Sequence, residues 1–239
     1  MNGVIGAAIG ASLALGVPHP APVDVQWNKG SGPVRMGKGL PNPPGWYRAA
    51  VGAGTPAKIL YLTFDDGPSR FTPALLKTLR RHDAVATFFI TGRAAAQRPG
   101  LVGRARRAGN AIGNHTYGHP RLVDLPTRAV RPQLRRTAKV VPGRVGPCMR
   151  PPYGLINARV ARASIAAGYQ PVLWTSHIED WESHDVRWTV HRLQRLTKPG
   201  AVILMHDTHA RTVSAVRKML PRWRAAGYRF AVVPVCEPE

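Results

Sequence analysis

Cysteine is nearly absent from the 239-residue chain, which contains only Cys148 and Cys236. Two cysteines are too few to build a disulfide scaffold, and they leave the cellular compartment of the protein open. Because the sequence contains no Cys-x-x-Cys pair, a zinc site built from thiolates is not expected.

Acidic residues are scarce as well: 12 Asp and Glu stand against 34 Lys and Arg, which gives a formal net charge of +22. This excess favours anionic partners, which could be nucleic acid, an anionic membrane surface or acidic polymers of a cell wall. No recognition motif for nucleic acid accompanies the charge. Arg128, Arg131, Arg135 and Lys139 recur at helical spacing and form a basic stripe. Such a stripe is usually a solvated helix face, and docking onto an anionic wall polymer or peptidoglycan is the functional interpretation.

Long apolar runs are also missing, except at the N-terminus. Residues 1–17 are small and apolar and precede a Pro-rich stretch. The run is about as long as a signal-peptide core and short for a membrane span, although no Lys or Arg precedes it. We expect residues 1–20 to be an export signal and residues 21–57 to be a Pro/Gly-rich linker or arm. The protein would then be secreted or associated with the cell wall, with no membrane span after removal of the signal.

From residue 58 to residue 236 the sequence alternates between short apolar runs and amphipathic stretches. Seven runs are typical of strands, at residues 58–64, 86–90, 111–114, 145–149, 171–175, 201–205 and 229–235. Six stretches are typical of helices, at residues 72–81, 101–108, 126–139, 158–167, 185–196 and 211–226. This alternation predicts an α/β domain with a parallel sheet under helices, either open or closed into a barrel. In a seven-stranded barrel the fourth and seventh strands end on opposite sides, so we favour unpaired cysteines.

Polar motifs follow five of the predicted strands. They are Asp65-Asp66, His115–His119, Arg150–Tyr153, Asp180-Trp181 and His206-Asp207. All five would lie at the carboxyl ends of parallel strands, where α/β proteins build their active sites. A turn would also explain Asp65-Asp66 before Gly67-Pro68, and a helix cap would explain Asp180. The repeated coincidence with strand ends favours one shared active site.

His115 and His119 are four residues apart and flank Gly118, so both imidazoles can reach one ion from a helix or a tight loop. A carboxylate from Asp65-Asp66 would complete a set of two histidines and one aspartate. This set is typical of catalytic zinc and of non-haem iron oxygenases. The oxygenases typically have a close His-x-Asp/Glu pair and a distant histidine, and the opposite order here argues against them.

A second carboxylate beside the metal ligand would serve as a general base, and His206 could be the acid. Arg150 would keep the base ionised by charge pairing. A surface position is the alternative for Arg150 in so arginine-rich a chain. The rigid Pro151-Pro152-Tyr153 segment that follows favours a place in the site.

These motifs resemble the five ordered motifs of the NodB-type polysaccharide deacetylases, the fourth family of carbohydrate esterases. The matching stretches are Thr63–Pro68, His115–His119, Arg150–Tyr153, Asp180-Trp181 and Leu204–His206. The resemblance covers about residues 58–235 and implies a distorted barrel of seven βα units. It also implies a metal-dependent hydrolase that removes N-acetyl groups from a polysaccharide containing N-acetylglucosamine, such as peptidoglycan or chitin oligomers.

The resemblance implies a role for each residue at the centre of the site. Asp66, His115 and His119 would hold a divalent metal, usually Zn²⁺, with Co²⁺ or another divalent ion as an alternative. Asp65 would be the base for the water that attacks the acetyl carbonyl, and His206 would protonate the departing amine.

The surrounding residues have implied roles too. Arg150 would orient the base, and Asp180 would tune its neighbours. The backbone N–H of Tyr153 would stabilise the oxyanion. Trp181 and Leu204 would line the small pocket for the acetyl methyl group.

One position departs from the family pattern, which often has a further acidic residue where this chain has His177. Because Asp180 is present, we expect activity to survive, and we interpret His177 as a polar neighbour of the site. Two other functions stay open on the same fold. One is an acetylxylan esterase, which acts on O-acetyl groups. The other is a non-catalytic cell-wall glycan-binding protein, against which the intact site residues argue.

Overall fold

The computed structural model describes residues 58–182 and 185–237. The predicted export signal and arm, residues 1–57, therefore lie outside the described residues. Among the helices of the described part, none has the length and apolar character that a membrane crossing requires.

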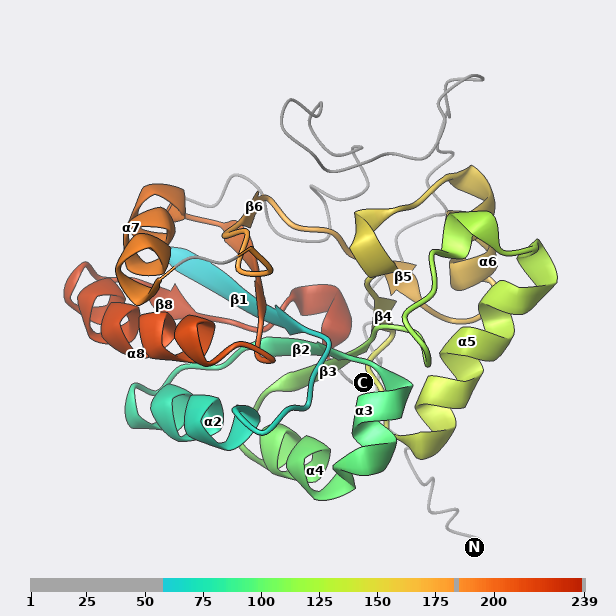
Figure 1. Cartoon of the computed structure of the whole chain (residues 1–239), viewed down its shortest axis with the longest axis horizontal. Helices are drawn as coiled ribbons and strands as arrows, with labels where there is room; N and C mark the ends of the chain where they lie inside the picture. The colour runs from blue at the N-terminus through green and yellow to red at the C-terminus, as the bar shows by residue number, and fades with distance from the viewer. Residues whose placement is uncertain (1–57, 183–184, 238–239) are drawn as a thin grey trace, which may run out of the picture.

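A curled sheet of parallel strands forms the centre of the molecule (Figure 1). Its strands are β1 (Ile59–Asp65), β2 (Thr87–Ile90), β3 (Ala111–Asn114), β4 (Cys148–Met149), β5 (Gln170–Pro171), β6 (Ser176–His177), β7 (Ala201–His206) and β8 (Arg229–Phe230). The order is β5-β4-β3-β2-β1-β7-β6, and β8 pairs with β1. The segment that holds β5 and β6 pairs with β4 at its start and with β7 at its end, so it links both edges of the sheet. The predicted distorted (β/α) barrel is confirmed.

Helices surround the sheet on its outer side (Figure 1). They are α2 (Thr72–Arg81), α3 (Gly92–Gln97), α4 (Pro99–Arg107), α5 (Thr127–Val140), α6 (Ala158–Ile165), α7 (Val186–Leu196) and α8 (Ala210–Ala225), with short 3₁₀ turns η1 (Leu122–Asp124), η2 (Pro152–Gly154) and η3 (Pro234–Cys236). Six of these helices match the predicted stretches. Helix α3 was not predicted, because six residues are too few to show a helical period.

The side chains of β1 alternate between two buried layers. Leu60, Leu62 and Phe64 belong to the layer beneath the outer helices, whereas Tyr61 belongs to the interior of the barrel. Since successive side chains of a strand point to opposite faces, Asp65 lies on the interior side with Tyr61. The last residue of β1 thus brings a carboxylate to the carboxyl-terminal mouth of the barrel.

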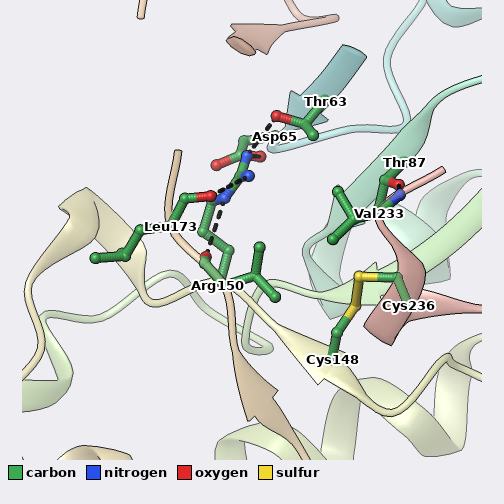
Figure 2. Close-up of a disulfide and its surroundings, with 9 residues drawn as sticks. Thr63, Asp65, Thr87, Cys148, Arg150, Leu173, Val233 and Cys236 are labelled. Atoms are coloured by element: carbon green, nitrogen blue, oxygen red, sulfur yellow. Dashed lines mark hydrogen bonds and ion pairs between the residues drawn. A yellow bond between two sulfur atoms is a disulfide. The ribbon is translucent and has the colours of Figure 1, made fainter. Parts of the chain in front are cut away.

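The prediction of unpaired cysteines is wrong, because Cys148 and Cys236 form a disulfide (Figure 2). The predicted last strand, residues 229–235, is only two residues long. After it the chain turns under the sheet, where the Val233 N–H donates to Thr87 Oγ1 at 2.9 Å. Thr87 begins β2, so the tail crosses at the amino ends of the strands. This path lies opposite the carboxyl-terminal mouth of the barrel and brings Cys236, after β8, to Cys148 at the start of β4.

Removing this disulfide should destabilise the fold. The bridge closes a loop with a sequence separation of 88, and the chain-entropy model assigns about 4.6 kcal/mol to a loop of that size. We expect the Cys148→Ser/Cys236→Ser double variant to lose about that much unfolding free energy in urea titrations. Wild-type protein titrated with urea in the presence of a reductant should have the same unfolding free energy as the double variant. A loss below about 1 kcal/mol would contradict this expectation.

Candidate active site

Asp65 and Asp66 both come close to His115 because the chain leaves the strand between them. Asp65 ends β1 and is 3% exposed. Asp66 has a φ of 72°, in the left-handed region, so its side chain does not follow the strand alternation. The next residue must be small, since a Cβ at Gly67 would lie 2.3 Å from Asp207 Oδ1. The turn is thus real, and it serves to place two carboxylates side by side.

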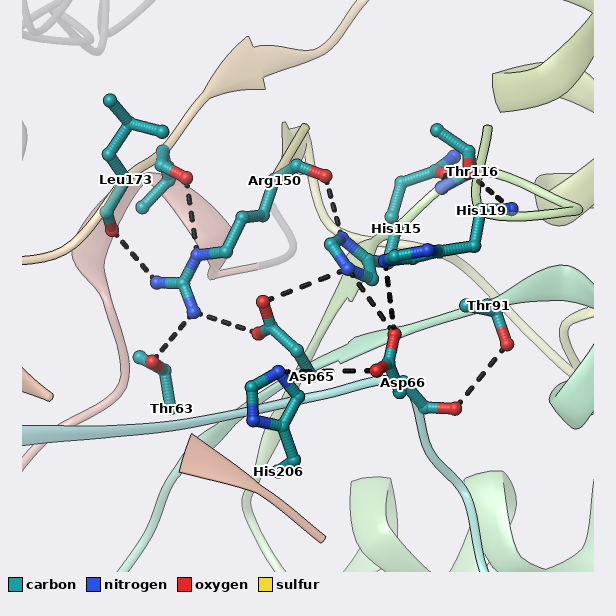
Figure 3. Close-up of polar contacts among 12 residues, drawn as sticks. Thr63, Asp65, Asp66, Thr91, His115, Thr116, His119, Arg150, Leu173 and His206 are labelled. Carbon is teal, nitrogen blue, oxygen red and sulfur yellow. Dashed lines mark hydrogen bonds and ion pairs between the residues drawn. The ribbon is translucent and has the colours of Figure 1, made fainter. Parts of the chain in front are cut away.

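Asp66, His115 and His119 converge at this point, as Figure 3 shows. One ligand atom of each lies within 4.8 Å of the other two. Asp66 Oδ1 is 3.5 Å from His115 Nε2 and 3.3 Å from His119 Nε2. Two imidazole nitrogens and one carboxylate oxygen form the donor set of a catalytic zinc site with open positions.

The state of His115 suits a metal ligand. Its Nδ1 lies 2.7 Å from the carbonyl oxygen of Arg150. Because a carbonyl can only accept a hydrogen bond, Nδ1 carries the proton and Nε2 presents a lone pair to the cleft. Burial lowers the pKa of His115 to about 3, so the imidazole is neutral at neutral pH. The residues present therefore fit a divalent metal ion.

Asp65 is held by a fully buried arginine (Figure 3). Arg150 Nη1 donates to Asp65 Oδ1 and to Thr63 Oγ1, both at 2.8 Å. The remaining donors reach the carbonyl oxygens of Val172 and Leu173 at 3.3 and 2.8 Å. Burial raises the pKa of Asp65 above its ordinary value, and the guanidinium opposes that rise. Arg150 is not a surface residue: the structure places it against the predicted base.

His206 lies on the other side of Asp66, at the end of β7. Its Nε2 is 4.0 Å from Asp66 Oδ2, and its Nδ1 is 2.7 Å from Asp180 Oδ1. The second oxygen of Asp180, Oδ2, accepts from the backbone N–H of His206 at 2.8 Å and from Thr212 Oγ1 at 2.7 Å. Burial alone would lower the pKa of His206, but the hydrogen bond and charge of Asp180 outweigh it and raise the pKa to about 9. Asp180 thus orients His206 rather than simply capping a helix.

This pair gives a prediction on pH dependence. The folded-state pKa of His206, about 9, lies above the ordinary 6.5. The protonated imidazole therefore stabilises the fold below pH 6.5, and this contribution is lost as the pH rises through about 9. Asp180→Asn should lower the pKa of His206 by more than about one pH unit. NMR titration of the His206 imidazole in metal-free protein measures this pKa. Glu179→Gln is the control and should leave the pKa of His206 unchanged. An unchanged pKa in Asp180→Asn would contradict the assignment.

Tyr153 and Trp181 lie beside two histidines of the site, and Leu204 belongs to the strand that ends with His206. The Tyr153 ring centroid is 4.5 Å from that of His119, and the Trp181 centroid is 5.8 Å from that of His206. Tyr153 is 58% exposed and Trp181 is 49% exposed, which is unusual for such large side chains. Leu204, two residues before His206, is buried in the barrel interior.

His177, where the family pattern often has an acidic residue, packs against a residue of the site. Its ring stacks on Trp181, with centroids 5.5 Å apart and planes 17° apart. Burial lowers its pKa, so it contributes no positive charge beside the site at neutral pH. Arg150, meanwhile, uses backbone carbonyls in place of a second acidic partner.

Asp207 is a structural part of the site to which sequence reasoning assigned no role. It is fully buried, accepts from Thr72 Oγ1, and receives the Ser69 hydroxyl on its backbone carbonyl at 2.6 Å. Burial raises its pKa to about 7. Asp207 thereby fixes the loop after Asp66 against the end of β7. In the sequence, only its position directly after His206 could have indicated that Asp207 belongs to the site.

The sequence profile of the polysaccharide deacetylase family matches residues 52–172. The chain belongs to that family. It is 37% identical over 180 residues to the peptidoglycan-N-acetylglucosamine deacetylase PgdA of Listeria monocytogenes, which covers 74% of this chain and 38% of the Listeria protein. It is 32% identical over 194 residues to a chitooligosaccharide deacetylase of Azorhizobium caulinodans, covering 73% and 92% of the two chains.

Among solved structures, a family 4 carbohydrate esterase from Streptomyces lividans, in complex with acetate, has the same fold. It shares 32% identity with a TM-score of 0.68, over 74% of this chain and 94% of that chain. The present chain thus spans nearly the whole of some relatives and about two-fifths of the Listeria protein.

Proposed function

We propose that this polysaccharide deacetylase family member removes N-acetyl groups from a polysaccharide that contains N-acetylglucosamine, either peptidoglycan or chitin oligomers. One observation carries the proposal: Asp66, His115 and His119 converge between a buried carboxylate, Asp65, and a histidine of raised pKa, His206. A hydrolytic site needs a base and an acid on either side of the reacting carbonyl. The similarity to a peptidoglycan-N-acetylglucosamine deacetylase and to a chitooligosaccharide deacetylase supports the same substrate class.

Asp66, His115 and His119 would hold the divalent metal ion, with Zn²⁺ the best match to the donor set and Co²⁺ an alternative. When bound, such an ion supplies Lewis acidity, which polarises a carbonyl and lowers the pKa of water.

The protein's own groups account for the proton transfers. Asp65, paired with Arg150, accepts a proton from the attacking water as the water oxygen bonds to the acetyl carbon. His206, protonated at neutral pH, donates from Nε2 to the amide nitrogen as the carbon–nitrogen bond breaks. Acetate and a free amine result. Asp180 holds His206 in place throughout.

The walls of the cleft would position the acetyl group. The Tyr153 backbone N–H is proposed to donate to the oxyanion that forms at the carbonyl. Trp181 would cover the acetyl methyl group from the His206 side. Leu204, from the strand that carries His206, would form the floor of this pocket.

The substrate is tested by acetate release from chitin hexamer, peptidoglycan and acetylxylan under identical conditions with zinc present. We expect the wild type to release acetate from the N-acetylated glycans. Asp65→Asn is the matched control and should release none. Release from acetylxylan alone would replace the proposal with an O-acetyl esterase. No release from any of them, with zinc bound, would favour a glycan-binding protein.

The metal ligands give a prediction of their own. His115→Ala removes one of three ligands, so bound zinc should fall from about one per chain to a small fraction after dialysis, with activity lost in parallel. His82→Ala, which changes a histidine of the loop after α2, is the control and should keep its zinc. Metal content by atomic emission decides, and full retention of zinc by His115→Ala would contradict the ligand assignment.

We also propose that the basic stripe on α5 docks the protein onto an anionic cell-wall polymer. Arg128, Arg131, Arg135 and Lys139 are all exposed, and within the described residues none is paired with an acidic group. A row of unpaired cations attracts polyanions.

Retention on cell-wall preparations tests the docking. Arg131→Glu/Arg135→Glu should weaken retention, whereas Arg187→Glu/Arg195→Glu, an equal charge change on α7, should not. Unchanged retention of the α5 variant would overturn the proposal, as would a preference for nucleic acid over wall polymer.

A secreted or wall-associated location is proposed for the same protein. The disulfide supports it, since disulfides persist in oxidising compartments. Fractionation of cells that express the full chain tests this, and protein confined to the cytosol with reduced cysteines would contradict it.

A further inference from the structure

The two histidines of the candidate metal site belong to a single loop with an unusual backbone. Residues 115–119 follow β3, and within them Thr116 has a φ of 64° and His119 a φ of 58°. Residues other than glycine rarely adopt this left-handed conformation, which costs about 1–3 kcal/mol each and persists only where the surroundings enforce it. The contacts that enforce it therefore set the positions of His115 and His119.

The start of α3 supplies one anchor, since the N–H groups of Gly92 and Arg93 donate to the carbonyl oxygens of Thr116 and Tyr117 at 2.9 and 3.0 Å. Helix α5 supplies another through one side chain, Gln133. Its Oε1 accepts the backbone N–H of Tyr117 at 3.2 Å and that of Gly118 at 3.1 Å. An amide oxygen has two lone pairs, and both are used here. The two N–H groups lie between the histidines in the sequence, so this one oxygen fixes the middle of the loop.

Neighbouring contacts hold the rest of the loop to the same helix. Asn114, fully buried, donates to the carbonyl oxygen of Leu134 at 3.0 Å and accepts the Thr116 N–H at 2.9 Å. Thr116 Oγ1 in turn accepts the His119 N–H at 3.1 Å. These bonds continue from α5 to the backbone of the second histidine.

The Tyr117 side chain is also enclosed. The Arg136 guanidinium carbon lies 3.6 Å from the centre of its ring, on the face of α5 that carries Gln133. On another side, a Cβ at Gly92 would lie 2.4 Å from Tyr117 Cδ2, so only glycine fits there. The loop is thus clamped between the start of α3 and α5.

We propose that Gln133 is a positioning residue for the metal site: it holds the backbone between His115 and His119 so that their imidazoles are preorganised for one ion. The inference rests on the proposed metal site but on no glycan substrate. Outer contacts that orient metal ligands are typically worth about 10–100-fold in metal affinity.

Zinc affinity of the full chain, measured by competition with a chromophoric chelator in the absence of any glycan, tests the proposal. Gln133→Leu removes the acceptor and should weaken zinc binding by about 10–100-fold. Gln133→Glu keeps an oxygen with the same reach and should retain at least the wild-type affinity. Gln194→Leu, the same change at an exposed position of α7, is the matched control and should bind zinc as the wild type does.

A second variant and a second measurement keep the test decisive if Gln133→Leu folds poorly. Gln133→Asn is one methylene shorter and cannot reach both N–H groups, so it should also bind zinc more weakly, and the Tyr117 and Gly118 amides should exchange hydrogen faster. Wild-type zinc affinity in Gln133→Leu or Gln133→Asn would overturn the positioning role of Gln133 and leave the proposed metal site intact. A wild-type chain that binds no zinc would overturn it together with the metal site. Loss of deacetylase activity does not enter either readout.

Discussion

Asp65→Asn should lower the rate constant for acetate release by at least about 100-fold, the usual contribution of a general base. The substitution keeps the shape of the side chain but removes its ability to accept the proton of the attacking water. Asp65 Oδ2 lies 3.7 Å from His115 Nε2, so the base borders the metal ligands without being one of the three that converge. Steady-state acetate release from chitin hexamer measures the effect.

The zinc content of Asp65→Asn must be measured in the same preparation, because lost metal would also abolish activity. We expect about one zinc per chain in the variant and the wild type alike. Arg70→Gln, a change at an exposed position of the same loop outside the proton-transfer groups, serves as a control for folding. Activity within tenfold of wild type would assign the base elsewhere.

Arg150→Met should destabilise the fold by about 3–5 kcal/mol, the cost of leaving a buried charge without its partner. Arg150 is fully buried, and four of its hydrogen bonds end on groups that would lose their donor. Methionine fills a similar volume, so the loss reflects charge and hydrogen bonding more than a cavity. Urea unfolding of metal-free protein measures it, and a loss below about 1 kcal/mol would contradict the assignment.

A double variant separates the two causes. In Asp65→Asn/Arg150→Met no buried carboxylate is left unpaired, so the double variant should lose less stability than the sum of the two single changes. Strict additivity would mean that Arg150 stabilises the fold only through its contacts with Thr63 and the two carbonyl oxygens, independently of Asp65. Arg159→Met, a half-buried arginine outside the site, is the matched control.

The sequence was sufficient to predict which polar groups lie together at the strand ends. Asp65 and His206 end strands, His115 and Arg150 directly follow strands, and parallel pairing brings such ends together whatever the details of the barrel. The apolar runs therefore predict that these four side chains lie together, whether the sheet is open or closed into a barrel.

Other features depend on contacts that no local pattern encodes. Cys236 reaches Cys148 only because β8 ends after two residues and the tail turns beneath the sheet. Gln133 reads as one more polar residue of an amphipathic helix, and its contacts with the metal loop become visible only once α5 is packed beside β3. Asp207 could be located but not interpreted, because its partners lie about 140 residues earlier in the sequence.

The most direct test of the proposed activity is a zinc titration of chelator-stripped protein, followed by acetate release from N-acetylglucosamine oligomers. The account predicts no release without metal, a linear rise as zinc is added, and a plateau at about one zinc per chain. Release that is equally fast before and after chelation would contradict a hydrolase built on Asp66, His115 and His119.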